Sequence, residues 1–193
     1  LVRRTLAPEY VVNGYGPTET VVTPLLWRAD AAASCGAAYA PIGERVGARS
    51  ARVLDGDLNP VPVGVTGELH LGGVGLARGY HGRPGLTADR FVPDPFRTDG
   101  GRMYRSGDRV RQRPDGLVDY LGRVDHQAKI RGFRVEPGEI EACLADHAEV
   151  REALVVVRGT PFGRQLVAYV AAERPGLADD LRTHLKGRVP DYM

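Results

Sequence analysis

Glycine and proline interrupt this chain so often that long helices cannot dominate its fold. The 193 residues include 25 glycines and 14 prolines, about a fifth of the chain. The length suits one large domain or two small ones, and a hydrophobic content of 42% is enough for a packed core. We therefore expect short strands and short helices in more than one small module.

The region from Pro41 to Tyr120 has the pattern of a small antiparallel sheet or barrel. Short apolar or alternating runs recur roughly every 8–12 residues between turn signals. Pro114-Asp115-Gly116 predicts a hairpin, Ser106-Gly107-Asp108 predicts the end of a strand, and residues 85–91 predict a short helix. The expected strands are 49–54, 67–71, 102–105, 109–112 and 117–121.

The N-terminal part predicts two further strands and a connection. Tyr10-Val11-Val12 predicts a strand that the glycines and proline of 13–17 interrupt. Thr20-Val21-Val22-Thr23 is β-branched throughout and predicts a second strand, ended by Pro24. The alanine-rich residues 28–40 predict a surface connection.

After Gly122 the pattern changes to that of a compact α+β module. Gly132 separates two short strands, 129–131 and 133–135, and Pro137 suits the first turn of a helix over 137–147. Within that helix, Ile140, Leu144 and His147 share one face. Strands 153–158 and 165–170, joined by a loop with Pro161 and Gly163, and a helix over 177–185 complete a β-β-α-β-β-α order. We expect the module boundary near residues 123–126.

Charge, cysteine content and hydropathy exclude several classes of protein. The 26 basic and 24 acidic residues nearly cancel, which argues against a nucleic-acid binder. No apolar run reaches the length of a membrane span. Cys35 and Cys143 are far apart, and the histidines lack metal-ligand spacing, so neither a disulfide framework nor a zinc site is expected. These features predict a protein of the reducing cytoplasm.

The stretch from Asn13 to Glu19 suits a nucleotide. Two glycines bracket Tyr15, so that the backbone can approach a flat ligand while the ring stacks on it. Thr18 offers a hydroxyl to a phosphate, and Glu19 offers one hard carboxylate to Mg²⁺. Taken alone, the same residues also fit an ordinary tight turn with an exposed acid.

A second candidate is Asp108, which follows a glycine turn and has a carboxylate able to accept both hydroxyls of a ribose. A dinucleotide fingerprint is excluded, because the third glycine of Gly73–Gly79 is one residue late and no helix can follow. The phosphate-binding loop of the GxxxxGK[ST] type does not occur.

The chain contains in this order Asn13–Glu19, GELHLGGVGLARGY at 67–80, YRSGD at 104–108, GLVDYLGRVD at 116–125 and KIRGFRVEPGEIE at 129–141. These five collinear motifs resemble the core motifs of adenylation domains of nonribosomal peptide synthetases. In that family ATP activates an amino acid as an aminoacyl-adenylate, and the acyl group then passes to the phosphopantetheine thiol of a peptidyl carrier protein. The resemblance covers essentially the whole chain.

The resemblance implies a role for each matching residue in nucleotide binding. Tyr15 would stack on adenine beside Asn13 and Gly14, Thr18 would contact the α-phosphate, and Glu19 would hold Mg²⁺. The ribose would be bound by Asp108, with Tyr120 and Arg123 flanking the nucleotide. Such chemistry needs Mg²⁺ and fixed donors rather than a covalent nucleophile.

The resemblance also implies how the module after the boundary acts. Asp125 matches the family's hinge, about which the small C-terminal module swings between the two half-reactions. Lys129 and Gly132 would belong to the face presented for thioester formation. An exposed strand lysine with no such role fits Lys129 equally well.

Substrate and partner expectations follow from three pocket positions and one helix. Gly14, Val22 and Thr23 match pocket-lining residues and suit a long or polar side chain, such as the ornithine- or lysine-type residues of siderophore synthetases. Residues 85–96 resemble the docking region for small MbtH-like proteins, with Ala88 as the matching contact. An ordinary surface helix fits the same stretch.

The implied fold is a multi-subdomain α+β chain. Residues 1–40 would be the end of an α/β core subdomain, residues 41–124 a distorted antiparallel β-barrel, and residues 126–193 a small mobile α+β subdomain. Family members have a glycine-rich phosphate loop before the stretch matched here and an adenylate-binding lysine after it, so we expect this fragment alone to be inactive. Alternatives are an acyl-CoA ligase of the same superfamily and a non-catalytic fragment that binds a carrier or MbtH-like protein.

Overall fold

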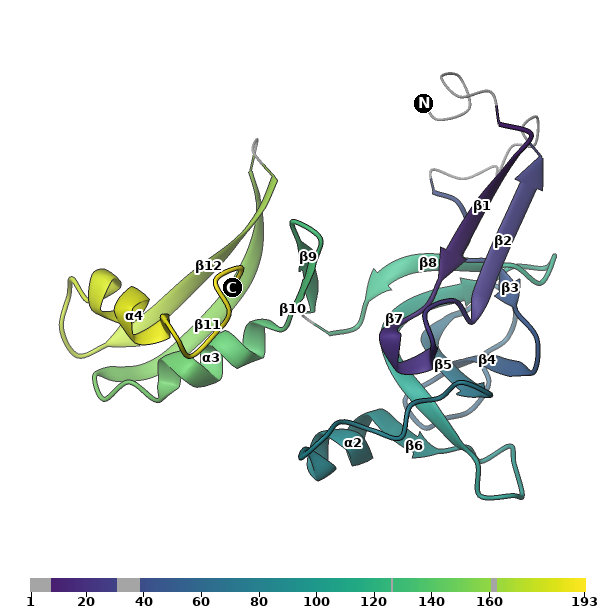
Figure 1. The fold of residues 1–193 in the computed structure, drawn as a ribbon, viewed down its shortest axis with the longest axis horizontal. Helices are drawn as coiled ribbons and strands as arrows, with labels where there is room; N and C mark the ends of the chain where they lie inside the picture. Colours follow the sequence, from purple (N-terminus) through teal and green to yellow (C-terminus); the bar gives the residue numbers. More distant parts are fainter. Residues whose placement is uncertain (1–7, 31–38, 126, 161–162) are drawn as a thin grey trace. The chain divides into compact units, whose positions relative to one another are not determined.

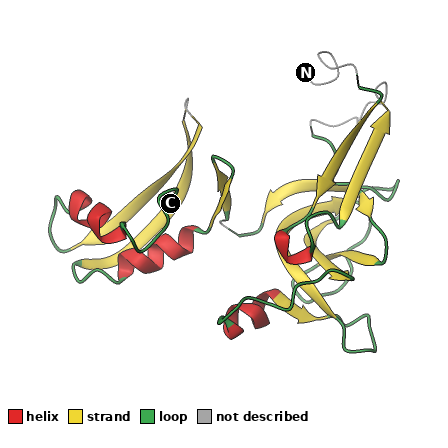
Figure 2. Cartoon of the chain, viewed as in Figure 1, coloured by secondary structure: helices red, strands yellow, loops and turns green. Residues whose placement is uncertain are grey.

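The computed structural model describes residues 8–30, 39–125, 127–160 and 163–193 (Figures 1 and 2). The chain divides into two compact units, the first ending at Val124 and the second beginning at Asp125. Cys35, Pro161 and His126, the last residue of the expected module boundary, lie outside the described residues.

The first sheet of unit 1 is antiparallel and contains β1 (Tyr10–Tyr15), β2 (Leu25–Asp30) and β3 (Glu44–Arg45). The predicted end of the first strand at residue 12 was wrong. Gly14 pairs with Leu26 and Tyr15 with Leu25, so β1 continues past Gly14 with β2 as its partner strand. The connection predicted from residue 28 was also wrong at its start, because β2 continues to Asp30 with Trp27 and Ala29 buried.

The strand predicted for residues 20–23 is absent. Thr18–Thr20 form a 3-10 turn, and Val21 and Val22 follow with φ of 55° and 62°. The Pro17 carbonyl accepts the N–H groups of Thr20 and Val22 at 3.1 and 3.3 Å. The chain must reverse between β1 and β2 in this short segment, so tertiary context overrides the β-branched composition.

The second sheet of unit 1 is a curled antiparallel sheet (Figure 2). The expected hairpin at Pro114-Asp115-Gly116 joins two of its strands. The expected short helix is present as α2 (Pro84–Arg90), and helices and strands together confirm the α+β class. The strand order is β4-β5-β7-β6, with β8 also paired to β7. Its strands are β4 (Arg49–Leu54), β5 (Thr66–Gly73), β6 (Phe91–Pro93), β7 (Arg102–Gln112) and β8 (Val118–Arg123).

The strand end predicted at Ser106-Gly107-Asp108 was wrong, because β7 runs through these residues without a break. Gly107 has a φ of +73°, and the β5–β7 register shifts between Glu68 and His70. The glycine therefore makes an irregularity within one long strand rather than a turn between two strands.

Residues from both sheets of unit 1 form one hydrophobic cluster. Leu25 of β2 packs with Leu69 and Leu71 of β5 and with Val110 of β7. Ile42 joins the cluster from the link between β2 and β3, and its N–H donates to the Val118 carbonyl at 2.8 Å. This packing joins the two sheets of unit 1.

Unit 2 has the expected β-β-α-β-β-α order. Val135, Ile140, Leu144, Val155 and Leu181 are central to its core. The first helix ends at Ala145, so His147 lies beyond it, contrary to the prediction. The elements are β9 (Ala128–Ile130), β10 (Phe133–Val135), α3 (Pro137–Ala145), β11 (Val150–Thr160), β12 (Gly163–Ala172) and α4 (Ala178–Leu185) (Figure 1).

Candidate nucleotide site

Asp108 is the centre of a network that joins three strands of unit 1. Its side chain is buried, and one carboxylate oxygen accepts the hydroxyl of Tyr15. The other oxygen accepts a guanidinium N–H of Arg123 at 2.8 Å. Tyr15 lies at the end of β1, whereas Asp108 and Arg123 are register partners on β7 and β8. Three of the residues predicted to bind the nucleotide are therefore in direct contact.

The electrostatics of this network keep Tyr15 a hydrogen-bond donor. Burial raises the pKa of the Tyr15 hydroxyl far above its usual value, and the Asp108 carboxylate raises this pKa further. The positive charge of Arg123 opposes the shift but does not reverse it. A carboxylate has about four lone-pair positions, so Asp108 can still accept hydroxyl groups beside these two partners.

Glu19 is the centre of a second buried network. Glu19 lies on the 3-10 turn and is 8% exposed. Its Oε1 accepts the hydroxyls of Tyr80 at 2.7 Å and Tyr104 at 3.0 Å. Phe91 lies against both tyrosine rings, with centroid distances of 5.5 and 5.2 Å. Burial raises the pKa of the Tyr80 hydroxyl, and its bonds to Tyr104 and Glu19 add to this, so it remains a donor.

The Glu19 carboxylate fits a magnesium ion that takes its other ligands from phosphate oxygens and water. Mg²⁺ usually takes only one or two carboxylates from a protein. Among the described residues, no group of three or more His, Cys, Asp or Glu side chains is arranged to hold a metal. A cage built from protein groups alone is therefore not found in this part of the chain.

The turn between β1 and β2 brings two of the three predicted pocket residues together. A Cβ added to Gly14 would be 3.1 Å from Cγ2 of Thr23, so a larger residue would press on that side chain. Val22 is 65% exposed and has a left-handed backbone conformation, a strained state for a β-branched residue. Thr18 is exposed at the start of the turn.

Two other residues predicted to bind the nucleotide, Asn13 and Tyr120, lie on β1 and β8. The Asn13 side-chain amide donates to the Pro41 carbonyl at 2.8 Å, which ties β1 to the link before β3. Tyr120 lies on β8, three residues before Arg123, and is 42% exposed.

The remaining predicted residues belong to unit 2. The Asp125 carboxylate accepts the N–H of Gln127 at 3.3 Å. Lys129 is exposed in the middle of β9, opposite Arg134 of β10. Gly132 forms the tip of this hairpin with a φ of +88°.

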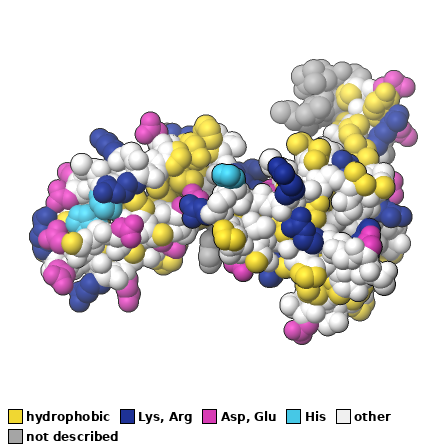
Figure 3. Space-filling view, turned by 60° about the horizontal axis from the view of Figure 1, so that its bottom comes forward, with side chains coloured by type: hydrophobic (Ala, Val, Ile, Leu, Met, Phe, Trp, Pro, Cys, Tyr) yellow, Lys and Arg dark blue, Asp and Glu magenta, His cyan; other side chains and the backbone are white. Residues whose placement is uncertain are grey.

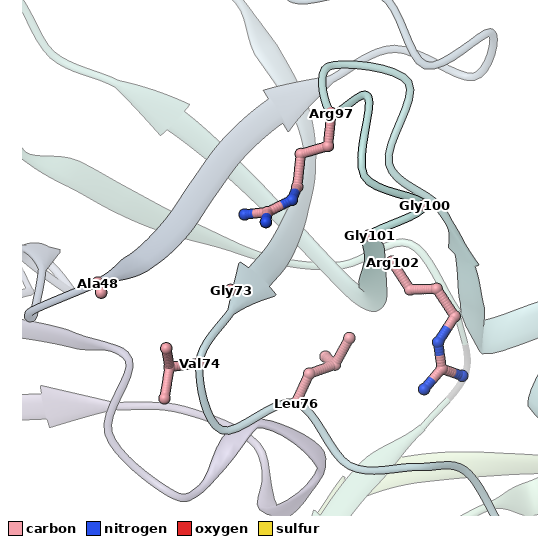
Figure 4. Close-up of a pocket in the computed structure, with 8 residues that line it drawn as sticks. All are labelled: Ala48, Gly73, Val74, Leu76, Arg97, Gly100, Gly101 and Arg102. Atoms are coloured by element: carbon pink, nitrogen blue, oxygen red, sulfur yellow. The ribbon is translucent and has the colours of Figure 1, made fainter.

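A separate hollow of about 540 Å³ lies beside β4, β5 and the start of β7 (Figure 4). Arg97 pairs with Asp99, and Arg102 donates to the carbonyls of Ala77 and Arg78. None of the predicted nucleotide-binding residues lines it, so we do not identify it with the candidate site. Its lining is Ala48, Gly73, Val74, Leu76, Arg97, Gly100, Gly101 and Arg102.

Sequence reasoning missed four residues that support the predicted ones. Tyr80 and Tyr104 hold Glu19, while Glu68 and Ser106 contact the backbone around Asp108. All four lie within the motifs quoted above, but their sequence separation from Glu19 and Asp108 hides most of these contacts.

Two further observations concern the charges on one face and the helices of the described residues. On the face shown in Figure 3, basic and acidic side chains are interspersed. Over the described ranges, no helix has the length and apolar character needed to cross a membrane.

Comparison with known proteins gives matches along most of the chain. Residues 2–81 match the AMP-binding enzyme family, and residues 139–193 match the AMP-binding enzyme C-terminal domain. The phosphinothricin tripeptide synthetase PhsB of Streptomyces viridochromogenes is 54% identical over 186 residues, which are 94% of this chain and 15% of PhsB. A dimodular nonribosomal peptide synthase of Bacillus subtilis is 50% identical over 185 residues, which are 95% of this chain and 8% of the synthase.

A solved structure gives the same result for the fold. It is NpsA-ThdA, an artificially fused adenylation–PCP di-domain nonribosomal peptide synthetase from Klebsiella oxytoca. The TM-score is 0.71 with 34% sequence identity, over 95% of this chain and 34% of that one. The chain thus spans a small part of the length of these relatives.

Proposed function

This chain belongs to the AMP-binding enzymes, and we propose that it forms part of an amino-acid-activating adenylation domain. Such a domain joins ATP and an amino acid to give aminoacyl-AMP and pyrophosphate, and then transfers the acyl group to a phosphopantetheine thiol. The observation that carries the proposal is that Tyr15 and Arg123 both donate to the buried carboxylate of Asp108, although the three residues come from three separate motifs.

In this proposal Asp108 binds the ribose. Its carboxylate accepts the ribose hydroxyls, while Arg123 at 2.8 Å prevents rotation of the group and offsets its charge. The hydroxyl of Tyr15 is fixed by the same carboxylate, which fixes the tyrosine ring for stacking on adenine. Asn13, Gly14 and Tyr120 complete the proposed base side of the site.

The phosphates in this proposal face the turn after β1. Thr18 donates its hydroxyl to the α-phosphate, and Glu19 holds Mg²⁺ with its orientation set by Tyr80 and Tyr104. When bound, Mg²⁺ would supply positive charge that offsets charge on the phosphate oxygens. The protein residues orient the reactants and supply no covalent nucleophile, so activation rests on positioning.

For the second half-reaction we propose that unit 2 presents its first hairpin to a peptidyl carrier protein. The unit begins at Asp125, the proposed hinge, and the exposed Lys129 and Gly132 lie on this hairpin. The adenylation–PCP di-domain among the relatives supports a carrier partner. The proposed location is the cytoplasm, where ATP and a free carrier thiol coexist.

Two finer proposals concern the amino acid and an activator. The short distance from a Cβ added at Gly14 to the Thr23 side chain supports a pocket that includes both residues. With Val22, such a pocket suits a long or polar side chain of the ornithine or lysine type, as in siderophore synthesis. Helix α2, which contains Ala88, buries none of its residues and so offers a surface to an MbtH-like protein.

The deciding experiment uses the full protein that contains this chain, in parent and Asp108→Ala forms. ATP with Mg²⁺ is titrated calorimetrically, and amino-acid-dependent pyrophosphate exchange is measured with a panel including ornithine and lysine. We expect Asp108→Ala to weaken ATP binding about tenfold or more, because hydrogen bonds to a charged acceptor contribute about 1.5–3 kcal/mol.

The matched control is Asp115→Ala, which removes a carboxylate from an exposed turn of the same sheet. Circular dichroism of the same full proteins verifies that each variant is folded. Equal ATP affinities in the parent and Asp108→Ala would contradict the ribose assignment. If none of the amino acids in the panel supports pyrophosphate exchange, the proposed activity is contradicted.

A further inference from the structure

We propose that Glu68 and Ser106 are positioning residues that fix the direction in which the Asp108 carboxylate points. This inference rests on the proposed function, in which Asp108 binds ribose. Neither residue needs to touch the nucleotide. They act through the backbone of Gly107 and Asp108 and through Arg123.

Glu68 holds the backbone one residue before Asp108. Its Oε1 accepts the N–H of Gly107 at 3.1 Å, and its Oε2 accepts a guanidinium N–H of Arg105 at 3.3 Å. Only 13% of the Glu68 side chain is exposed, so removing its partners would leave a charge poorly solvated. Glu68 thereby ties β5 to β7 where their register shifts.

The backbone at this point needs such a tie. Gly107 has a φ of +73°. Glycine adopts this conformation without steric cost, but residues of a regular extended strand have a negative φ. Glycine is also the least restricted residue, so its φ must be fixed by contacts. The bond from Gly107 to Glu68 is such a contact, and the backbone at Gly107 sets where the next residue points.

Ser106 holds both Asp108 and the cation beside it. Ser106 is 2% exposed, and its hydroxyl accepts the Asp108 N–H at 3.0 Å while donating to the Leu69 carbonyl at 2.7 Å. The Ser106 carbonyl accepts one N–H of Arg123 at 3.0 Å, and the same guanidinium donates to Asp108 Oδ1 at 2.8 Å. One serine therefore fixes the main chain of Asp108 and the group that holds its side chain.

Asp108 and its neighbours on β7 are held from both adjacent strands, β5 and β8. Glu68 and the Leu69 carbonyl come from β5, and Arg123 comes from β8. A carboxylate fixed in this way is preorganised, and binding needs no further ordering of it. Small misplacements of such a group have large effects on binding geometry.

The test measures discrimination between ATP and 3′-deoxy-ATP in the full protein that contains this chain. The parent is compared with Glu68→Ala, Ser106→Ala and the conservative Glu68→Gln, which keeps an acceptor for Gly107. We expect the two alanine variants to lose about tenfold of the preference for ATP, and Glu68→Gln to retain most of it. An effect on folding alone would lower the affinity for both nucleotides equally.

Asp55→Ala is the matched control. Asp55 also accepts two backbone N–H groups, those of Asp57 and Asn59 at 2.9 Å, but it follows β4 and contacts none of the Asp108 network. We expect this variant to be less stable than the parent and to keep the parent's ATP preference.

Unchanged discrimination in both alanine variants, together with lost discrimination in Asp108→Ala, would overturn this inference and leave the ribose assignment intact. Unchanged discrimination in all three would instead overturn the ribose assignment. Amide hydrogen exchange of the parent supplies a second measurement if an alanine variant does not fold. Slow exchange at Gly107 and Asp108 is expected, and rapid exchange at both would refute the role of Glu68 and Ser106.

Discussion

Replacing Gly16 by alanine should destabilise unit 1, because the structure leaves no room for one methyl group. A Cβ at this position would be 2.0 Å from Cδ of Pro24, 2.5 Å from the Val22 carbonyl oxygen and 2.8 Å from its carbonyl carbon. Non-bonded carbon atoms prefer separations of about 3.5–4.0 Å. The obstructing atoms belong to a buried proline ring and to backbone, so no flexible side chain can move aside.

The expected cost follows from this geometry. Overpacking usually costs about 1–3 kcal/mol, and a rigid clash of this size belongs at the upper end of that range. With a urea dependence of about 1–3 kcal/mol per molar, the midpoint of unfolding should fall by about 1 M or more. The displaced turn contains Glu19, so its bonds to Tyr80 and Tyr104 should weaken as well.

The assay is urea unfolding followed by the fluorescence of Trp27, which lies in β2 next to this turn and reports on unit 1. Gly56→Ala is the control, because a Cβ at Gly56 would meet no atom within 4 Å. We expect the control to change the midpoint by little. A Gly16→Ala midpoint equal to that of the control would refute the steric argument and the close approach of the two ends of this turn.

Two further predictions concern backbone strain and pH. Val22→Gly should raise the unfolding free energy by about 1 kcal/mol, because it relieves a left-handed β-branched residue with φ of 62° at an exposed position; an unchanged or lower stability in urea would contradict this. Burial lowers the pKa of His70 below 6.5, and Arg105 lowers it further against the opposing charge of Glu68. The unfolded state therefore binds more protons than the folded state as the pH falls below 6.5. Above that pH the contribution of neutral His70 to the free energy of unfolding is complete. Below it, the free energy of unfolding of unit 1 should fall by up to about 1.4 kcal/mol per pH unit. His70→Gln should reduce this slope in unfolding measurements at pH 7.5 and 5.5, and an equal slope in both proteins would exclude His70 as its source.

The fold of unit 2 illustrates how much local pattern can predict. Gly132 between the short runs 129–131 and 133–135 predicted two strands joined at a tight hairpin or bulge, and Pro137 predicted the start of the following helix. Both elements occur, because the positive φ at Gly132 and the fixed φ of proline are properties of single residues. The end of that helix was misjudged by two residues, since no comparable residue fixes where the helix ends.

The turn after β1 illustrates the limit of such reasoning. Thr20–Thr23 has the composition of a strand, but a strand needs a partner, and β2 pairs with residues 10–15 instead. The local preference of β-branched residues is worth less than the hydrogen bonds of the β1–β2 pair. For the same reason Asn13–Tyr15 became part of a strand despite a glycine.

The amino-acid sequence by itself determined the α+β character, the antiparallel strands of unit 1, the element order of unit 2 and the order of the motifs. These depend on residue types and on spacings of a few residues. The tertiary structure alone decided which motifs meet, because Tyr15 and Asp108 are 93 residues apart and Glu19 and Tyr104 are 85 apart. It also showed Glu68 and Ser106 around Asp108, because the contact of Glu68 depends on how β5 pairs with β7, two strands that are not consecutive in the chain.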